Sequence, residues 1–281
     1  MPDNDFVLSA EVLNILLRDH TTGMNIFWAT HDYESLGSEY DYHSQILPEL
    51  ISGEHGMVIC PRVLKSKEKQ TDRSKDMAEV FTPSWICNAQ NNLIDEAITN
   101  SSSPDGEVGR GLWKDYVRTT CLEITCGEAP YLVSRYDATT GEMIPMEKRI
   151  GLLDRKLRVV SKNTKTSEEW LEWSEVAYKN IYGYEWQGDN LLLARQNLLL
   201  SFIEYYKAKF ATLPSEEAIH HIAEIISWNL WQMDGLRGVP PDYPSPGELQ
   251  DNPIPDMFTT YSILRDWDNN TEIRYIDLIN K

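Results

Sequence analysis

The first third of the chain shows two patterns of apolar positions, one at helical spacing and one of short runs between turns. Residues 6–19 have apolar residues at helical spacing behind Ser9, which is suited to be the N-cap of a helix. Short apolar runs between glycine-containing turns predict strands at residues 23–30 and 56–64. Residues 1–75 are therefore expected to form an N-terminal mixed α/β region.

The helical pattern returns further along the chain. Residues 84–98 are predicted to continue an amphipathic helix, with Thr82 as its N-cap and Pro83 at its first helical position. Residues 190–210 are apolar almost all round, which is typical of a buried helix. Another helix is predicted around residues 215–226.

Strand-like runs separate these helices from residue 118 onward. One run covers residues 121–125, the next ends at Glu185, and a third ends at Asp234. The two segments between the first and second runs, residues 151–163 and 167–180, fit either helices or strands. This alternation predicts an α/β fold with a parallel, doubly wound sheet, whose ligands would lie at the carboxyl ends of the strands.

The second part of the chain, residues 76–281, is expected to be one domain. It would carry an insertion at about residues 137–179 and a proline-rich C-terminal part at about residues 237–281, which ends in a possible strand at residues 272–279. If the sheet has no further strand beside its first one, that strand has an unpaired edge. We expect the C-terminal segment, the N-terminal region or a second copy to cover it.

Composition excludes several classes of protein. The chain of 281 residues has 41% hydrophobic residues and no long uncharged apolar run, and its first residues are acidic, so we expect neither a membrane span nor a signal peptide. Its four cysteines have no C-x-x-C spacing, and His220 and His221 have no metal-ligand partners at suitable spacing. We expect a cytoplasmic protein with reduced thiols, no membrane contact and no metal site.

Charge limits the possible partners. The net charge is -18, whereas proteins that hold DNA by themselves usually present a basic face. Contact with DNA would therefore need a partner or a local basic patch, and the best candidate patch is residues 61–75. The simpler interpretation of that segment is a solvated linker or helix face.

Four segments resemble, in the same order, motifs of the amino-methylating adenine DNA methyltransferases of restriction–modification systems. Within that family the chain more closely resembles the bacterial proteins described as restriction endonuclease modification subunits. The segments are "VFTP" (80–83), "LEITCGEAPYL" (122–132), "IYGYE" (181–185) followed by "NLLLARQNLL" (190–199), and "NLWQMDGL" (229–236). The resemblance implies S-adenosylmethionine as cofactor and a partial Rossmann-like methyltransferase sheet. It covers roughly residues 76–236.

The resemblance also implies a set of cofactor-binding residues. Gly127 would let the backbone approach the methionine and ribose of the cofactor, Glu185 would accept the ribose hydroxyls, and Asp234 would accept the adenine amine. Phe81 and Tyr131 would offer apolar or stacking surface. The complete set of expected binding residues is Phe81, Thr82, Pro83, Glu123, Thr125, Cys126, Gly127, Glu128, Glu185, Trp186 and Asp234.

The sequence departs from the family pattern around these residues. Ala129 stands where the first motif usually has its second glycine, and Ile124-Thr125 stands where it usually has Asp-Pro. The stretch from Gly127 to Glu185 is much longer than the about 20 residues typical of a dinucleotide-binding unit, which is the reason for expecting the insertion.

The catalytic N-P-P-Y motif of the family is absent. "VPPDYP" (239–244) and "DNPIPDMF" (251–258) do not match it, and the chain ends about where the family's fourth strand would begin. We therefore assign no catalytic residue, and we expect little or no activity without a complementing methyltransferase or restriction chain. Two alternatives stay open: a non-enzymatic scaffold or regulator of restriction or phage defence, and a nucleotide-binding module unrelated to methylation.

Overall fold

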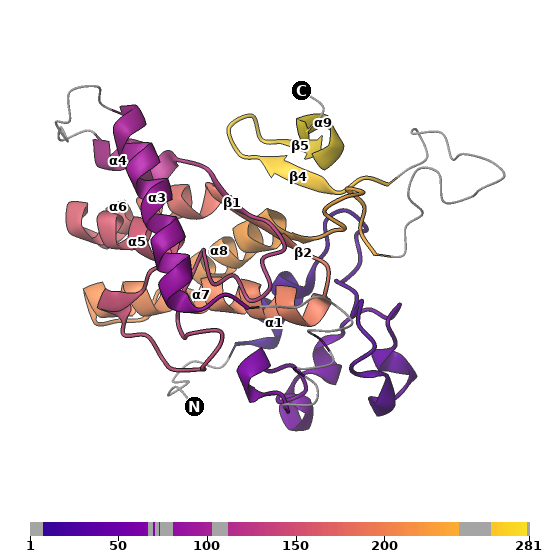
Figure 1. Ribbon diagram of the computed structural model, residues 1–281. Coiled ribbons are helices and arrows are strands. Elements are labelled where there is room, and N and C mark those ends of the chain that lie inside the picture. The colour runs from indigo at the N-terminus through magenta and orange to yellow at the C-terminus, as the bar shows by residue number, and fades with distance from the viewer. Residues whose placement is uncertain are drawn as a thin grey trace.

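The centre of the molecule is a three-stranded parallel sheet, seen in the computed structural model of Figure 1, which describes residues 8–66, 70, 73, 81–102, 112–241 and 260–279. The strands lie in the order β1 (Cys121–Glu123), β2 (Ile181–Glu185) and β3 (Leu230–Gln232). In the register, Cys121 is opposite Ile181 and Gly183 is opposite Leu230. The chain is thus α/β with a parallel sheet, as its pattern predicts.

Helices connect and cover these strands. The α-helices are α1 (Ala10–Leu17), α3 (Ser84–Ser102), α4 (Leu112–Arg118), α5 (Leu152–Asn163), α6 (Ser167–Lys179), α7 (Gly188–Phe210), α8 (Glu216–Asn229) and α9 (Tyr275–Ile279). Short 3-10 helices are η1 (Glu34–Leu36), η2 (Ser38–Tyr40), η3 (Pro48–Leu50), η4 (Gly53–His55), η5 (Arg62–Leu64) and η6 (Met146–Lys148). Strands β4 (Ile263–Asp266) and β5 (Thr271–Arg274) form an antiparallel hairpin.

The two faces of the sheet are covered differently. On one face the central hydrophobic core packs helices α7 and α8 against the sheet (Figure 1). On the other face Tyr184, Trp231 and Met233 pack against Leu264 of the C-terminal hairpin. Leu122 of β1 remains 48% exposed on that second face.

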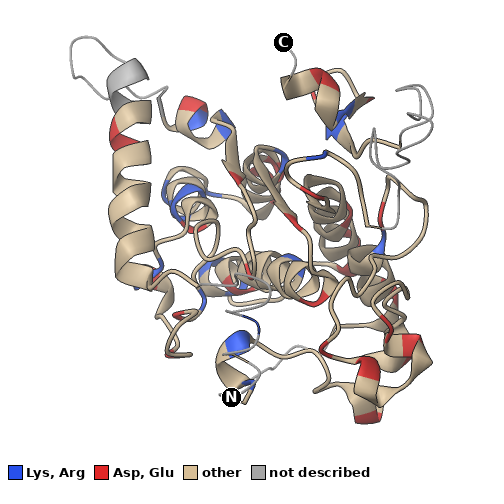
Figure 2. Ribbon diagram, turned by 45° about the vertical axis from the view of Figure 1, so that its right-hand side comes forward, with Lys and Arg blue, Asp and Glu red and all other residues tan. Residues whose placement is uncertain are grey.

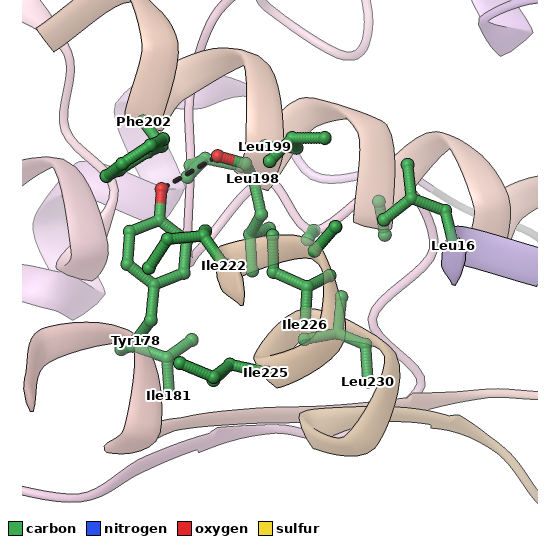
Figure 3. Packing of buried hydrophobic residues seen from close by; sticks show 14 of the residues in the cluster. Leu16, Tyr178, Ile181, Leu198, Leu199, Phe202, Ile222, Ile225, Ile226 and Leu230 are labelled. Atoms are coloured by element: carbon green, nitrogen blue, oxygen red, sulfur yellow. Dashed lines mark hydrogen bonds between the residues drawn. The ribbon is translucent and has the colours of Figure 1, made fainter. Parts of the chain in front are cut away.

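Helix α7 forms the middle of the core. The Tyr178 hydroxyl donates to the carbonyl of Leu198 at 2.8 Å, and Ile222 and Ile226 of α8 lie beside this pair (Figure 3). Since nearly every face of α7 is buried, the all-round apolar pattern of residues 190–210 is explained.

A buried arginine on α7 ties the N-terminal region to the rest of the chain. Its guanidinium donates to the carbonyls of Leu16, Arg18, Ser227 and Leu230, so Arg195 links α1, α8 and β3. Burial lowers the pKa of Arg195 to about 10, which still leaves it protonated at neutral pH. The cost of burying this charge is offset by hydrogen bonds to main-chain oxygens.

Of the two predicted N-caps, the one of α1 is confirmed and the one of α3 is not. Ser9 is the N-cap of α1, and its hydroxyl accepts the N–H of Val12 at 3.2 Å, as expected. The predicted N-cap of α3 was wrong: the helix begins at Ser84, whose N–H is capped by the carboxylate of Asp137 at 2.9 Å. A distant side chain therefore does the work that Thr82 was expected to do.

The predicted N-terminal strands were also wrong. Residues 23–30 make only isolated pairings with their neighbours, and residues 62–64 belong to η5. The Gln232 side chain accepts the N–H of Phe27 at 2.8 Å and donates to its carbonyl at 2.9 Å. One amide side chain of β3 thus takes both main-chain groups that a partner strand would have used.

The structure also shows which of the ambiguous segments are helices and which are strands. Residues 151–163 and 167–180 are helical, as α5 and α6. The possible C-terminal strand at residues 272–279 is divided between β5 and α9. In the described part of the chain β1 pairs only with β2, because the hairpin lies over a face of the sheet and not along its edge.

None of the helices within the described residues combines the length and the apolar character needed to cross a membrane.

Candidate functional site

A cavity of about 820 Å³ opens where β1 and β2 end. Its size falls in the range of small-molecule and cofactor sites, and its position at the carboxyl ends of parallel strands is where ligands bind in open α/β sheets. Eight of the eleven predicted residues line it: Phe81, Thr82, Glu123, Thr125, Cys126, Gly127, Glu185 and Trp186.

The turn after β1 has an unusual main-chain conformation. Thr125, Gly127 and Ala129 have φ angles of 46°, 53° and 62°, so every second residue is left-handed. Glycine adopts this conformation readily, whereas a β-branched residue such as Thr125 is strained there by roughly 1–2 kcal/mol. Within the turn, the N–H of Cys126 donates to the carbonyl of Tyr184 at 2.9 Å and the N–H of Ala129 donates to the carbonyl of Cys126 at 2.7 Å, so the protein itself takes up these donors.

Gly127 is also held close to the opposite wall. A Cβ atom added at Gly127 would lie 3.1 Å from the ring of Phe81, which is tighter than nearly all real contacts. The absence of a side chain therefore keeps the aromatic ring against the turn. The expected reason for this glycine was a close approach of the cofactor, whereas the structure shows a close approach of Phe81.

Glu185 joins the turn to the next element. One carboxylate oxygen of Glu185 accepts the N–H of Gly127 at 2.8 Å, and the other accepts the N–H of Gln187 at 3.1 Å. Burial raises the pKa of Glu185, and these N–H donors partly oppose that rise. A carboxylate has about four acceptor positions, so the two bonds leave capacity for a ligand.

Glu123 supports the far side of the same turn. Its carboxyl group accepts the N–H groups of Tyr131 at 3.3 Å and Leu132 at 3.1 Å. Burial raises the pKa of Glu123 to about 8, because the charged form loses its hydration. Glu123 is therefore a largely neutral structural acid at pH 7.

Helix α3 forms a second wall of the cavity. The Asn91 amide donates to the carbonyls of Tyr131 and Ile150, both at 3.0 Å. The hydroxyl of Tyr131 donates to the side chain of Gln90, which holds the ring at the side of the cavity. The cavity is thus open and not filled by its own side chains. The motifs missed Gln90 and Asn91, because nothing local marks a polar helix position as facing a ligand.

A buried ion-pair network fixes the start of α7 beside the cavity. Asp189 accepts hydrogen bonds from Lys65 at 2.7 Å, Arg73 at 2.8 Å and the Tyr33 hydroxyl at 2.8 Å. Burial alone would raise the pKa of Asp189, but the two cations outweigh it and hold the pKa well below its usual range. No local pattern predicts this network, since its members come from distant segments.

The same network changes the view of the basic segment. Lys65 and Arg73 belong to the candidate patch at residues 61–75, yet their side chains are 5% and 0% exposed. They point into the protein and neutralise Asp189. Because these two cations are buried, the described part of the segment at residues 61–75 offers little free positive charge. The rest of that segment lies partly outside the described residues.

Three predicted residues do not line the cavity. Asp234 accepts the N–H groups of Leu236 at 2.8 Å and Arg237 at 3.1 Å, so it caps the turn after β3. Glu128 is buried and accepts the N–H of Arg62 at 2.7 Å, and Pro83 only precedes the first turn of α3. The structure thus brings the first and second motifs together, but it does not bring Asp234 to them.

Comparisons with known proteins do not assign this chain to a family. No family model, no curated protein and no solved structure matches the chain. Among the residues that the structure describes, no group of three or more His, Cys, Asp or Glu side chains could hold a metal ion.

Proposed function

We propose that the chain binds S-adenosylmethionine in the cavity at the ends of β1 and β2, on a methyltransferase-like fold of DNA adenine modification. One observation carries the proposal: the left-handed turn at Gly127 and the acid at the end of β2 meet across 2.8 Å beside a cofactor-sized cavity. These are the positions that the motif resemblance assigns to the methionine and ribose contacts.

The residues at the cavity fit the chemistry of this cofactor. The lack of a side chain at Gly127 leaves room for the methionine part of the cofactor to approach the main chain of the turn. Glu185 retains acceptor capacity for ribose hydroxyls. Ile94 and Ile124 supply apolar surface at the same cavity. When bound, S-adenosylmethionine supplies an electrophilic methyl group, and these residues would hold and orient it.

Catalysis is a separate matter from binding. The N-P-P-Y motif is missing, and residues 242–259, which contain most of its two imperfect counterparts, lie outside the described residues. We expect the isolated chain to transfer little or no methyl group to unmethylated DNA. A complementing chain would have to supply the groups that hold the target base.

Isothermal titration with S-adenosylmethionine and its demethylated product tests the binding proposal. We expect binding by the wild type and a loss of about tenfold or more in Glu185→Gln, because a charge-assisted acceptor becomes neutral. ATP and a nicotinamide dinucleotide in parallel titrations test the nucleotide-binding alternative. No heat of binding at millimolar cofactor would refute the proposal.

Gly127→Ala provides a sharper test because it has a matched control. Gly127 and Gly53 have φ angles of 53° and 56°, but only Gly127 has a neighbour that an added Cβ would approach. Both variants carry the same main-chain strain of about 1 kcal/mol, and Gly127→Ala should lose somewhat more stability than Gly53→Ala because its Cβ also crowds the ring of Phe81. Only Gly127→Ala should lose cofactor affinity.

A non-enzymatic scaffold is the second candidate, and one observation favours it. Leu122 and Ile124 are 48% and 62% exposed at the β1 side of the sheet, where a buried parallel strand would hide them. The net charge of -18 would suit a basic protein partner. Retained cofactor binding together with cofactor-dependent methyl transfer by the isolated chain would argue against this candidate.

A further inference from the structure

Two carboxyl groups that influence each other line the cavity at the ends of β1 and β2. Glu123 is the last residue of β1, and Glu185 is the last residue of the neighbouring strand β2. Each residue is 9% exposed. Burial raises the pKa of Glu123, and the nearby Glu185 raises it further. Both acids would ionise more easily with a cation beside them in the cavity.

The turn after β1 has few main-chain donors left for an anionic ligand. The N–H of Gly127 donates to Glu185, and those of Tyr131 and Leu132 donate to Glu123. Other N–H groups of the turn donate to main-chain carbonyls. An anion at this turn would therefore compete with hydrogen bonds that the protein already makes.

The wall formed by α3 presents an acceptor to the cavity. Asn91 lines the cavity and is fully buried, and its amide nitrogen donates to the carbonyls of Tyr131 and Ile150. Since both N–H bonds of the amide are used, the group left over is the oxygen. Oδ1 of Asn91 has no hydrogen-bond partner among the residues that the structure describes. Buried acceptors are seldom left without a donor, so an N–H group of a ligand is the partner that this oxygen lacks.

Positive charge does not balance these acceptors. Within the described part of the chain, no Lys, Arg or His side chain lines the cavity. Helix α3, at the left of Figure 2, contains neither Lys nor Arg. Arg62 lies 5.5 Å from the ring centroid of Phe81, but Arg62 does not line the cavity. The side chains of Gln90 and Gln187 are neutral, so they would not offset the charge of a phosphate group.

We propose that this cavity selects its ligand by positive charge: it takes an organic cation that carries N–H donors, and it discriminates against phosphate-bearing nucleotides. The choice of adenosyl compounds as ligands rests on the proposed function, whereas the selection for charge rests on the lining of the cavity. A cation would be attracted by the carboxylates of Glu123 and Glu185 and could donate to Oδ1 of Asn91. A triphosphate would meet the same carboxylates as like charges.

Selection by charge separates ligands that share the same adenosine part. S-adenosylmethionine carries a sulfonium, an ammonium and a carboxylate group, so its net charge is positive at pH 7. Its demethylated product is a thioether without net charge. Decarboxylated S-adenosylmethionine lacks the carboxylate and is more positive still. The protein should therefore hold the two sulfonium compounds more tightly than the neutral product.

Isothermal titration of the wild type with these three compounds and with ATP, at pH 7 and about 0.1 M salt, tests the selection. Decarboxylated S-adenosylmethionine should bind at least as tightly as S-adenosylmethionine. S-adenosylmethionine should bind about tenfold or more tightly than its demethylated product, and ATP should bind more weakly than all three. In Glu185→Gln the affinities for S-adenosylmethionine and its product should differ by only about threefold or less, because one carboxylate is lost.

Two lysine variants of α3 form a matched pair that leaves the buried acids in place. Ile94 lines the cavity and is 39% exposed, whereas its neighbour Leu93 is 66% exposed and does not line it. Ile94→Lys should lower the preference for S-adenosylmethionine over its product by about fivefold or more, a ratio that crowding alone would not change. Leu93→Lys should keep the ratio within about twofold of the wild type, because the charge lies outside the cavity. Thermal unfolding checks that both variants fold.

Two results would overturn the selection for charge. One is equal affinity of the wild type for S-adenosylmethionine and its demethylated product, which would leave the proposed function intact. The other is tighter binding of ATP than of the sulfonium compounds. Binding of decarboxylated S-adenosylmethionine without binding of S-adenosylmethionine would support the selection for charge and refute the proposed function. If none of the four compounds binds, both proposals are refuted.

Discussion

The buried carboxyl group of Glu123 should make the stability of this protein fall as the pH rises. Burial raises the pKa of Glu123 from 4.5 to about 8, so between these values the folded protein keeps a proton that the unfolded chain releases. The stabilising contribution is complete below pH 4.5 and is lost as the pH approaches 8. At about 1.4 kcal/mol per unit, this shift corresponds to roughly 4–5 kcal/mol.

Glu123→Gln tests this directly. Glutamine keeps an oxygen that can accept the N–H groups of Tyr131 and Leu132, but it does not titrate. Urea unfolding at pH 5, 6, 7 and 8 gives the free energy of unfolding of both proteins. We expect the variant to gain at least about 2 kcal/mol relative to the wild type between pH 5 and 8. Glu142→Gln is the matched control, because Glu142 is exposed and its replacement should leave the difference flat.

One result would show the reasoning to be wrong. If the wild type and Glu123→Gln lose or gain stability in parallel from pH 5 to 8, then the carboxyl group titrates alike in the folded and unfolded chains. The turn after β1 would then rest on a charged acid and not on a neutral one.

Three further variants probe the backbone around the site by thermal or urea unfolding. Thr125→Gly should stabilise the protein by about 1 kcal/mol, because Thr125 is exposed and its φ of 46° is strained. Thr120 is also exposed but has no positive φ, so Thr120→Gly should destabilise the protein by about 0.5–1 kcal/mol. Gly188→Ala should destabilise by more than 3 kcal/mol or prevent folding, since its Cβ would lie 2.0 Å from a main-chain oxygen; a loss below 1 kcal/mol would contradict the packing. Asp137→Ala should cost at least about 1 kcal/mol at pH 7, because it removes the cap of α3 and the bonds from Thr139 and Thr140. Hydrogen bonds hold the pKa of Asp137 below its usual value of 3.8 against the effect of burial, so the difference from wild type should shrink as the pH falls below about 4.

The sequence was informative where local pattern decides structure. The buried character of residues 190–210 predicts the correct helix, the runs at residues 121–125 and 180–185 predict the strands found at Cys121–Glu123 and Ile181–Glu185, and their alternation predicts a parallel sheet. The glycine turn and the acid of the second strand were expected to share one edge, and Gly127 and Glu185 are in hydrogen-bond contact there. Each of these features depends on periodicity or on a single local conformational demand.

Contacts between distant segments were not predictable in this way. Asp137 caps α3 from more than fifty positions away, and Lys65 and Arg73 reach Asp189 across a still longer stretch of chain. No period or local motif encodes such pairings, because they arise only after the core has brought the segments together. Asp234 shows the same limit, since its predicted role depended on a turn whose direction its neighbours could not reveal.

The turn after β1 shows that residues other than glycine can adopt the same left-handed main-chain conformation. Of its three left-handed positions, only Gly127 is glycine, and Thr125 and Ala129 hold the same shape at a cost in strain. Hydrogen bonds from the turn to Glu123 and Glu185 compensate for that cost. A search that scores glycine identity would therefore not detect a turn of this main-chain geometry, whereas a comparison of dihedral angles would.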